Sequence, residues 1–441
     1  MKIFVGLLIY MGLYRNAAVG EYWNKDGTSP TNNITSYMGQ TRFEEIKRWF
    51  HISPPATFPR NGWYEKLQPL TGNLERRFQL YVLPASQVAV DEMMVRFTGR
   101  SQHTVRMPSK PIPEGYKIYA LCDRGYTYAW AYSSRVDSFL GFDKPFPGPH
   151  PKGPDNPLVL SPTSRMFFWL CQSLPSKEHR FTVYCDNYFS NVPLFKALGI
   201  FGITCCGTAR PNSAGYPAAL KINKHQSELE WGTMAGEVVD DVLCIIWQDK
   251  SLVRFMTTAY NMKPSIETYT YRERRRPRIP KGRSHYRNMI ESVWGENARQ
   301  VLPLPTASVD YNLFMGGVDI ADQRRSYLCN QLRVCRTWVP LFFWLLLTTS
   351  INSFLVAQQD QAQRGNSADK RFNDSRTFLR DLAWQLVQEG YNEDHAGDLN
   401  FQLTTIGSTP HQEPTRRALN GDFLLGNKPL GNSSQSRKQD K

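Results

Sequence analysis

The sequence lacks the paired cysteine motifs that hold structural zinc. It contains eight cysteines and eight histidines, but no two cysteines have Cys-x-x-Cys spacing and no histidine lies at zinc-ligand spacing from a cysteine pair. The cysteines are scattered and mostly flanked by apolar residues: Cys122, Cys171, Cys185, Cys205, Cys206, Cys244, Cys329 and Cys335. This pattern predicts buried, reduced thiols, as in cytosolic or nuclear proteins, and no structural zinc.

Acidic residues are also few relative to basic ones. The chain has 53 Lys and Arg against 39 Asp and Glu, a formal net charge of +14. This excess indicates a polyanionic partner, with nucleic acid first and an acidic membrane surface second. Hydrophobic residues make up 41% of the 441 residues, which is enough for a large core in two or three domains, or in one domain with an insertion.

Long hydrophobic runs are rare, and only two segments resemble membrane elements. The apolar start, residues 1–15, lacks a small-x-small cleavage site and continues into helix-compatible sequence, which argues against a signal peptide. Residues 339–357 carry no charge over nineteen positions, but their second half is polar. This composition favours a buried core helix over a transmembrane span, and no membrane partner is expected.

Short β-branched and aromatic runs in the middle of the chain predict a sheet. Three runs near residues 87–97, 116–123 and 126–134 predict an antiparallel meander. A helix over 164–173, a strand over 180–185, a helix over 191–198 capped by Ser190, and a strand over 202–206 are predicted to follow. The order β-β-β-α-β-α-β is that of a ribonuclease-H-like sheet.

Helices are predicted at both ends of the chain. Residues 1–50 have helical periodicity and a capping box from Thr41 to Glu44. Residues 377–387 predict another helix, and from residue 391 the polar composition predicts disorder. The Pro- and Gly-rich stretch 143–157 predicts a surface loop.

Three aspartates, Asp91, Asp186 and Asp319, each follow an apolar stretch and are spread over most of the chain. Carboxylates placed at strand ends by folding are hard oxygen ligands for Mg²⁺ or Mn²⁺, which suggests metal-assisted chemistry on phosphodiesters. Asp319 and Asp322 follow Gly316-Gly317 and share one helix face. Each acid also has a simpler interpretation: a turn at Asp91, an Asx-turn or helix cap at Asp186, and a helix-dipole contact at Asp319 or Asp322.

A basic run follows Tyr271 in the segment between the second and third aspartates. Its cations are Arg272, Arg274, Arg275, Arg276, Arg278, Lys281 and Arg283. The run is consistent with a solvated loop, with a nuclear import signal, or with contacts to DNA phosphates, for which closely spaced arginines are suited.

The sequence resembles the piggyBac-type transposases and piggyBac-derived host proteins. The matching segments, in order, are VDEMMVRFTGR, PSKP leading to GYKIYALCD, VYCDNYFSN, WQDK, YNLFMGGVDIADQ and the helix that contains FFW and NSF. They extend over roughly residues 1–390. The resemblance implies a DDD set of metal-binding acids at Asp91, Asp186 and Asp319, with Asp322 as a further acid of the catalytic motif.

The same resemblance implies the architecture: an α+β ribonuclease-H-like core interrupted by a β-rich insertion, with a helical dimerisation and DNA-binding module. The expected parts are residues 1–86 and 328–390 for the helical module, 87–212 and 302–327 for the core, 213–301 for the insertion and 391–441 for a disordered polar tail. It further implies two Mg²⁺ or Mn²⁺ ions, a nuclear homodimer, and double-stranded DNA partners, namely transposon ends and a TTAA target.

Two departures from the family pattern concern the ends of the chain. Met1 falls where the helical region of the family is already under way, and no cysteine follows Cys335, where many members have a Cys/His-rich zinc-binding tail. These departures bear on recognition of transposon ends and not on the catalytic core. The expected function is a DNA transposase; the alternatives are a non-catalytic, transposon-derived DNA-binding protein or inactive truncated remnant and, more weakly, a membrane protein built on residues 339–357.

Overall fold

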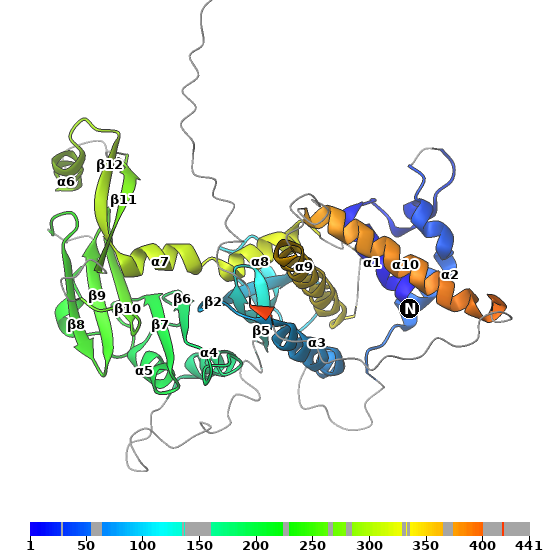
Figure 1. Cartoon of the computed structure of the whole chain (residues 1–441), viewed down its shortest axis with the longest axis horizontal. Helices are drawn as coiled ribbons and strands as arrows, with labels where there is room; N and C mark the ends of the chain where they lie inside the picture. Colours follow the sequence, from blue (N-terminus) through cyan, green and yellow to red (C-terminus); the bar gives the residue numbers. More distant parts are fainter. Residues whose placement is uncertain are drawn as a thin grey trace, which may run out of the picture.

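A computed structural model of the chain describes most residues before 400. The described residues are 1–27, 30–53, 64–134, 136, 160–223, 229–262, 268–278, 285–328, 332, 336–364, 374–399 and 417–418. Figure 1 shows strands β8–β10 at one end of the molecule and helices α1, α2 and α10 at the other, with α3, α8 and α9 between them.

A mixed sheet forms the centre of the fold. Its first strands are β2 (Gln87–Arg96), β4 (Glu114–Asp123) and β5 (Tyr126–Ser133), which pair antiparallel as the predicted meander, and β3 (Val105–Arg106) pairs with β4. Strand β6 (Phe181–Cys185) runs parallel to β2, and β7 (Ile203–Thr208) runs parallel to β6. Helices α4 (Pro162–Cys171) and α5 (Val192–Ile200) precede these two strands. The predicted order of elements is therefore confirmed.

The segment predicted as an insertion extends this sheet. Strands β10 (Leu252–Thr257), β9 (Val242–Gln248) and β8 (Met234–Val239) continue it antiparallel from β7. A separate two-stranded ribbon consists of β11 (Tyr269–Arg275) and β12 (Arg299–Pro305), with α6 (His285–Trp294) between them in sequence. The expected division of the chain into domains stays a prediction.

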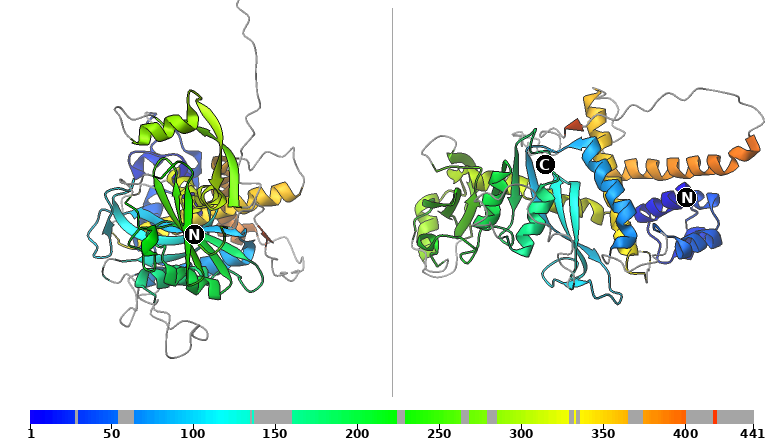
Figure 2. Two further views of the ribbon diagram at one scale, coloured as in Figure 1. Left: turned by 90° about the vertical axis from the view of Figure 1, so that its left-hand side faces the viewer. Right: turned by 90° about the horizontal axis from the view of Figure 1, so that it is seen from below.

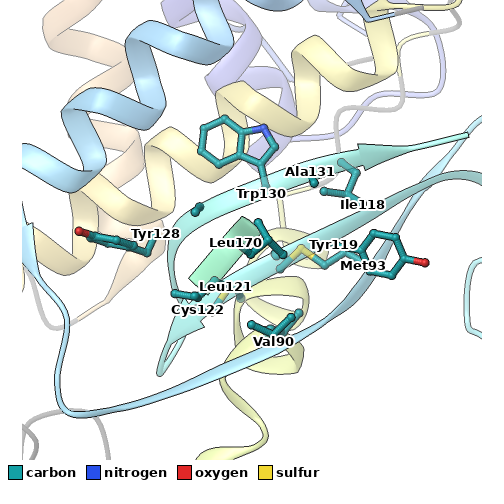
Figure 3. Packing of buried hydrophobic residues seen from close by; sticks show 14 of the residues in the cluster. Val90, Met93, Ile118, Tyr119, Leu121, Cys122, Tyr128, Trp130, Ala131 and Leu170 are labelled. Carbon is teal, nitrogen blue, oxygen red and sulfur yellow. The ribbon is translucent and has the colours of Figure 1, made fainter. Parts of the chain in front are cut away.

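Apolar residues of the first strands form the main core together with neighbouring helices. Figure 3 shows Val90 and Met93 of β2, Leu121 of β4 and Leu170 of α4 in one cluster. The ring of Trp130 on β5 lies 5.8 Å from Phe78 of α3 (Gln68–Tyr81) and 5.6 Å from Trp344 of α9 (Val339–Gln363), measured between ring centroids. Each fully buried side chain of this size contributes about 1.5–3 kcal/mol, so the core fixes the strand positions.

Helices from the two ends of the chain pack together. Helix α1 (Lys2–Leu13) lies along α10 (Ser375–Leu399), as both figures of the whole chain show (Figures 1 and 2). The approach is close because a Cβ at Gly6 would lie 2.7 Å from the carbonyl oxygen of Ala383. Lys2 also pairs with Glu389 and Glu393, at 3.1 and 2.6 Å. The remaining short elements are α2 (Gln40–Trp49), η1 (Val19–Trp23), η2 (Asn33–Tyr37), η3 (Glu65–Leu67), η4 (Ala218–Leu220), and β1 (Val82–Leu83) paired with β13 (Arg417–Ala418).

Two predicted helix caps are wrong. Helix α2 begins at Gln40 after Gly39, with no side-chain cap, so Thr41 lies inside the first turn and cannot start a capping box with Glu44. Helix α5 is capped by Asn191, which accepts a hydrogen bond from the N–H of Leu194 at 2.9 Å. Ser190 is unsuited to that role because its hydroxyl donates to the carbonyl oxygen of Asp186 instead.

Other predictions fall partly outside the described residues. Six cysteines, those before residue 245, are buried free thiols as predicted, while Cys329 and Cys335 lie outside the described residues. The predicted loop 143–157 lies outside them as well. Helix α10 continues past residue 391, where a polar tail was predicted, and ends at Leu399.

The apolar segment 339–357 forms most of α9, a helix inside the fold. Among the described helices it is long and apolar enough to cross a membrane, but 72% of its most apolar window is buried, as predicted for a core helix. One polar residue on it has a specific partner: the amide of Asn352 accepts from the N–H of Thr127 at 3.0 Å and donates to its carbonyl oxygen at 2.8 Å. The polar half of the helix therefore anchors α9 to β5.

Replacing Asn352→Ala should destabilise the fold by about 1–3 kcal/mol, because it leaves both backbone groups of Thr127 buried without a partner. The measurement is the midpoint of urea or thermal unfolding. The matched control is Ser353→Ala, the exposed neighbour on the same helix. Equal unfolding midpoints for the two variants would contradict this role of Asn352.

Candidate active site

Asp91 and Asp186 lie side by side on neighbouring parallel strands. The last paired residues of β2 and β6 are Val90 and Cys185, and each aspartate is the next residue along the chain, Asp91 within β2 and Asp186 directly after β6. The prediction that Asp91 ends a strand is wrong for the pairing with β4. Strand β2 continues to Arg96 along β4, and Asp91 is opposite Ala120 in that pairing. Only the pairing with β6 stops before it. The two acids are thus brought together by strand register.

Backbone N–H groups hold both carboxylates. Oδ1 of Asp91 accepts from the N–H of Glu92 at 2.8 Å, and Oδ1 of Asp186 accepts from the N–H of Tyr188 at 2.9 Å. The second contact is the Asx-turn that was the alternative interpretation of Asp186. The turn therefore fixes the carboxylate where β6 ends, beside Asp91.

Burial and mutual repulsion make these negative charges costly. Burial raises the pKa of Asp91 to about 7, with further contributions from the charges of Glu92 and Asp186. Burial also raises the pKa of Asp186, against which the N–H of Tyr188 acts. Carboxyl groups whose pKa values rise for these reasons gain most from a bound cation, because it offsets the repulsion.

Lysines supply the positive charge near these acids. The Nζ atom of Lys110 lies 3.3 Å from Oε1 of Glu92, and Nζ of Lys117 lies 4.0 Å from Oε2, an oxygen that is buried without a hydrogen-bond partner. Burial alone would lower the pKa of Lys110. The negative charges of Glu92 and Asp91 have the larger combined effect, so the pKa of Lys110 is raised. Sequence reasoning missed both lysines as site residues, since the β2–β4 register that places Lys117 here is not visible in the sequence.

Two aromatic rings complete this side of the site. The ammonium group of Lys117 lies 4.6 Å from the ring centroid of Tyr119 and 4.8 Å from that of Tyr188. Lys117 is buried, whereas Tyr188, two residues after Asp186, is exposed. Cation–π contacts of this kind hold a lysine in place. The site therefore combines acidic side chains with the ammonium group of Lys117, which these rings hold at its edge.

Asp319 lies on helix α8, and its charge acts on Lys110, which also lies near Asp91. Helix α7 (Thr306–Phe314) is followed by α8 (Gly317–Ser326), and Asp319 is exposed in the first turn of α8. Glycine at position 317 allows a close approach of α8 to β4, because a Cβ there would lie 3.1 Å from the carbonyl oxygen of Cys122. The charge of Asp319 also raises the pKa of Lys110. Lys110 is therefore an electrostatic neighbour of both Asp91 and Asp319.

Asp322 has a different environment. Its carboxylate forms an ion pair with Arg325, whose side chain is buried over the ring of Trp344 on α9. This contact ties α8 to α9. The structure thus gives Asp322 a stabilising partner one turn beyond Asp319.

The donor set fits a hard divalent cation. Asp91, Asp186 and Glu92 supply carboxylate oxygens, the ligands that Mg²⁺ and Mn²⁺ prefer. Their negative charges repel one another, and a bound cation would offset this repulsion. Within the described ranges, however, no three His, Cys, Asp or Glu side chains converge closely enough to hold a metal ion. A bound ion would activate water and stabilise the departing oxygen of a phosphodiester. Asp91 and Asp186 would hold it, and Asp319, whose charge acts on the same Lys110 as that of Asp91, would be the third ligand.

The structure corrects the interpretation of the basic run as a loop. Arg272, Arg274 and Arg275 lie in strand β11. Arg274 is an internal anchor, with Nη2 at 3.2 and 3.1 Å from the two carboxylate oxygens of Asp249. Arg276 donates to the carbonyl oxygen of Gly295 at 2.8 Å. Arg272, Arg275 and Arg278 are exposed, while Lys281 and Arg283 lie outside the described residues.

The fold agrees with comparisons to known proteins. A family model described as transposase IS4 matches residues 1–354, so the chain belongs to this family of transposases. Within it, the chain is of the piggyBac type. The human piggyBac transposable element-derived protein 3 is 23% identical over 330 residues, 73% of this chain and 49% of that protein. The human piggyBac transposable element-derived protein 2 is 22% identical over 268 residues, 60% of this chain and 43% of that protein.

The chain spans about half the length of these human relatives. A cryo-EM structure of a piggyBac transposase synaptic complex with hairpin DNA is similar over 93% of this chain and 78% of that chain. The TM-score is 0.63 and the identity 17%, so this likeness shows the fold. The predicted ribonuclease-H-like fold is confirmed.

Mg²⁺ or Mn²⁺ should raise the melting temperature of the protein at constant ionic strength, because the ion stabilises the folded acid pair; an ion at 100 times its Kd would add about 2.7 kcal/mol. Asp91→Asn should abolish this rise and, without metal, be no less stable than the unmodified protein, because it removes a buried charge beside Glu92. Glu114→Gln, at an exposed position at the start of β4, is the control. Equal shifts in all three proteins would contradict a metal site at Asp91.

Proposed function

We propose that this protein is a piggyBac-like DNA transposase that performs metal-dependent DNA strand cleavage and strand transfer. The observation that carries the proposal is the register of β2 and β6, which sets Asp91 and Asp186 next to each other in a partly buried site. Membership of a transposase family supports phosphodiesters as the substrate.

The residues divide into three roles in this reaction. Asp91, Asp186 and Asp319 bind the divalent ions, for which two Mg²⁺ or Mn²⁺ ions are proposed. Lys110 is partly exposed beside Glu92 and would contact a DNA phosphate near the acids. Lys117 is buried against Glu92, Tyr119 and Tyr188 and would hold Glu92 in place. Asp322 keeps α8 in place through Arg325.

The finer parts of the proposal follow from the family. We propose cut-and-paste transposition into TTAA targets, by a homodimer that acts on double-stranded transposon ends in the nucleus. The positive charge of the chain supports a DNA partner. The cryo-EM structure of the similar transposase is a synaptic complex with hairpin DNA, which supports the same class of partner.

A second candidate is a transposon-derived, non-catalytic DNA-binding protein. Two observations favour it. Among the residues that the structure describes, three acids do not converge into one cluster. The similar human proteins are themselves named as transposable element-derived. The two candidates differ in strand cleavage and share DNA binding.

Asp186→Asn should abolish Mg²⁺-dependent nicking of supercoiled DNA and leave DNA affinity within about twofold, because it removes a metal ligand and no basic residue. Nicking is followed on gels with Mg²⁺ and with Mn²⁺, and affinity by fluorescence anisotropy. Glu114→Gln should nick at the rate of the unmodified protein. Nicking by Asp186→Asn at the unmodified rate would remove the catalytic proposal and leave the DNA-binding one.

The β11–β12 ribbon offers the DNA surface that fits these observations best. Tyr271 is opposite Pro303 and Arg275 is opposite Arg299, so these four side chains share one face of the ribbon. Tyr271 is 69% exposed, and Arg299 is an exposed partner of Glu273. The ribbon extends away from the rest of the sheet (Figure 1). A duplex groove admits a two-stranded ribbon of this kind.

Arg275→Ala combined with Arg299→Ala, on the face that carries Tyr271, should reduce the slope of log affinity against log salt by about 0.9 for each DNA phosphate that the protein no longer neutralises. Arg274→Ala is the matched control on the same ribbon, because its guanidinium is held by Asp249. It should lower the melting temperature and leave the salt slope unchanged. An unchanged slope in the double variant would mean that these arginines contact no DNA phosphate and lie on a solvated surface.

A further inference from the structure

Three side chains form a hydrogen-bonded series beside the acid site. The hydroxyl groups of Tyr184 and Tyr260 are 2.7 Å apart, and the Tyr260 hydroxyl donates to Oδ2 of Asp310 at 2.8 Å. Because a hydroxyl has one proton and that of Tyr260 goes to Asp310, Tyr184 must donate to Tyr260. Burial and the contact with Tyr184 raise the pKa of Tyr260, which keeps this proton in place.

The hydrogen-bonded series joins the two segments of sequence that carry the second and third acids. Tyr184 is buried in β6, two residues before Asp186. Asp310 lies in α7, the helix that leads through Met315 and Gly316 into α8 and Asp319. Tyr260 follows β10 and touches both Tyr184 and Asp310. Figure 1 shows α7 running from the β-strand end of the molecule to α8.

Packing around these three residues holds α7 against the sheet at both of its ends. Near its start, the Cys206 thiol on β7 donates to the carbonyl oxygen of Ala307 at 3.8 Å. At its end, the ring centroid of Phe314 lies 5.5 Å from that of Tyr184. Tyr184, Cys206 and Ala307 form one small buried cluster. Helix α7 is therefore held against the sheet at both ends, and in its middle Asp310 accepts the hydrogen bond of the Tyr260 hydroxyl.

We infer that Tyr260 is a positioning residue of the acid site: it locks α7 onto β6 and thereby sets the position of Asp319 relative to Asp186. The inference rests on the proposed function, since it concerns the affinity of the same three acids for divalent ions. Tyr260 touches none of these acids and acts through Tyr184 and Asp310. Groups that hydrogen-bond directly to metal ligands change ion affinity by about 10–100-fold. Tyr260 acts one contact further away, so we expect an effect at the lower end of that range.

The test replaces Tyr260→Phe in the full chain, which removes the hydroxyl and keeps the ring. Mn²⁺ affinity, measured by electron paramagnetic resonance, should fall about tenfold. The Mn²⁺ or Mg²⁺ concentration for half-maximal nicking should rise by the same factor, with the maximal rate recovered at saturating metal. DNA affinity should not change, because no basic residue is altered.

The control is Tyr216→Phe, which removes the hydroxyl of a buried tyrosine that donates to the backbone carbonyl of Ile245 at 3.3 Å. It should lower the melting temperature about as much as Tyr260→Phe but leave Mn²⁺ affinity unchanged. Asp310→Asn retains a neutral acceptor for Tyr260 and should give a smaller loss of Mn²⁺ affinity than Tyr260→Phe.

The outcomes separate this inference from the proposed function. Equal Mn²⁺ affinity in the unmodified protein and Tyr260→Phe, with nicking intact, overturns the positioning role and leaves the transposase proposal. A tenfold loss of Mn²⁺ affinity without nicking by any of the proteins supports the positioning role and overturns the catalytic proposal. No Mn²⁺ binding by the unmodified protein overturns both.

Discussion

The parallel pairing of β2 with β6 places two carboxylates next to each other in a partly buried site, and the geometry of the candidate site depends on this pairing. Burial raises the pKa of Asp91 to about 7, with Glu92 and Asp186 adding to the effect. Buried charges of like sign are costly, so this pair is the part of the site that would gain most from a bound cation. Lys110 and Lys117 supply positive charge from the neighbouring segments, with Nζ atoms 3.3 and 4.0 Å from Glu92.

The rest of the sheet makes that contact rigid. Strand β2 is held on one side by β4 along most of its length and on the other by β6 up to Val90. The core beneath it includes Trp130, which packs against α3 and α9, and α9 is in turn anchored by Asn352. Since a slip of one residue would turn every side chain to the opposite face, this packing also fixes the direction of the two carboxylates.

The sequence predicted this architecture well where periodicity and chain order carry the information. The meander, the α-β-α-β order after it and the buried nature of residues 339–357 all follow from local pattern. Predictions failed where the outcome depended on a competing local contact: Ser190 could cap a helix, but its hydroxyl bonds to Asp186 and Asn191 caps instead. Register and long-range pairing were not predictable at all. Lys117 enters the site through the β2–β4 register, and Arg274 leaves the DNA surface because Asp249 holds it.

One continuous stretch of chain connects the proposed DNA surface to the third acid. Strand β12 ends at Pro305, α7 begins at the next residue, and α8 with Asp319 follows directly. A rigid α7 therefore fixes the β11–β12 ribbon and Asp319 relative to each other, because neither end of the helix has a long loop that could absorb movement. The Tyr260 contact sits in the middle of this path and connects it to β6, the strand that carries Asp186. In the proposed reaction the DNA and the ions must be held in a fixed relative position, and α7 is the helix that connects the two proposed binding surfaces.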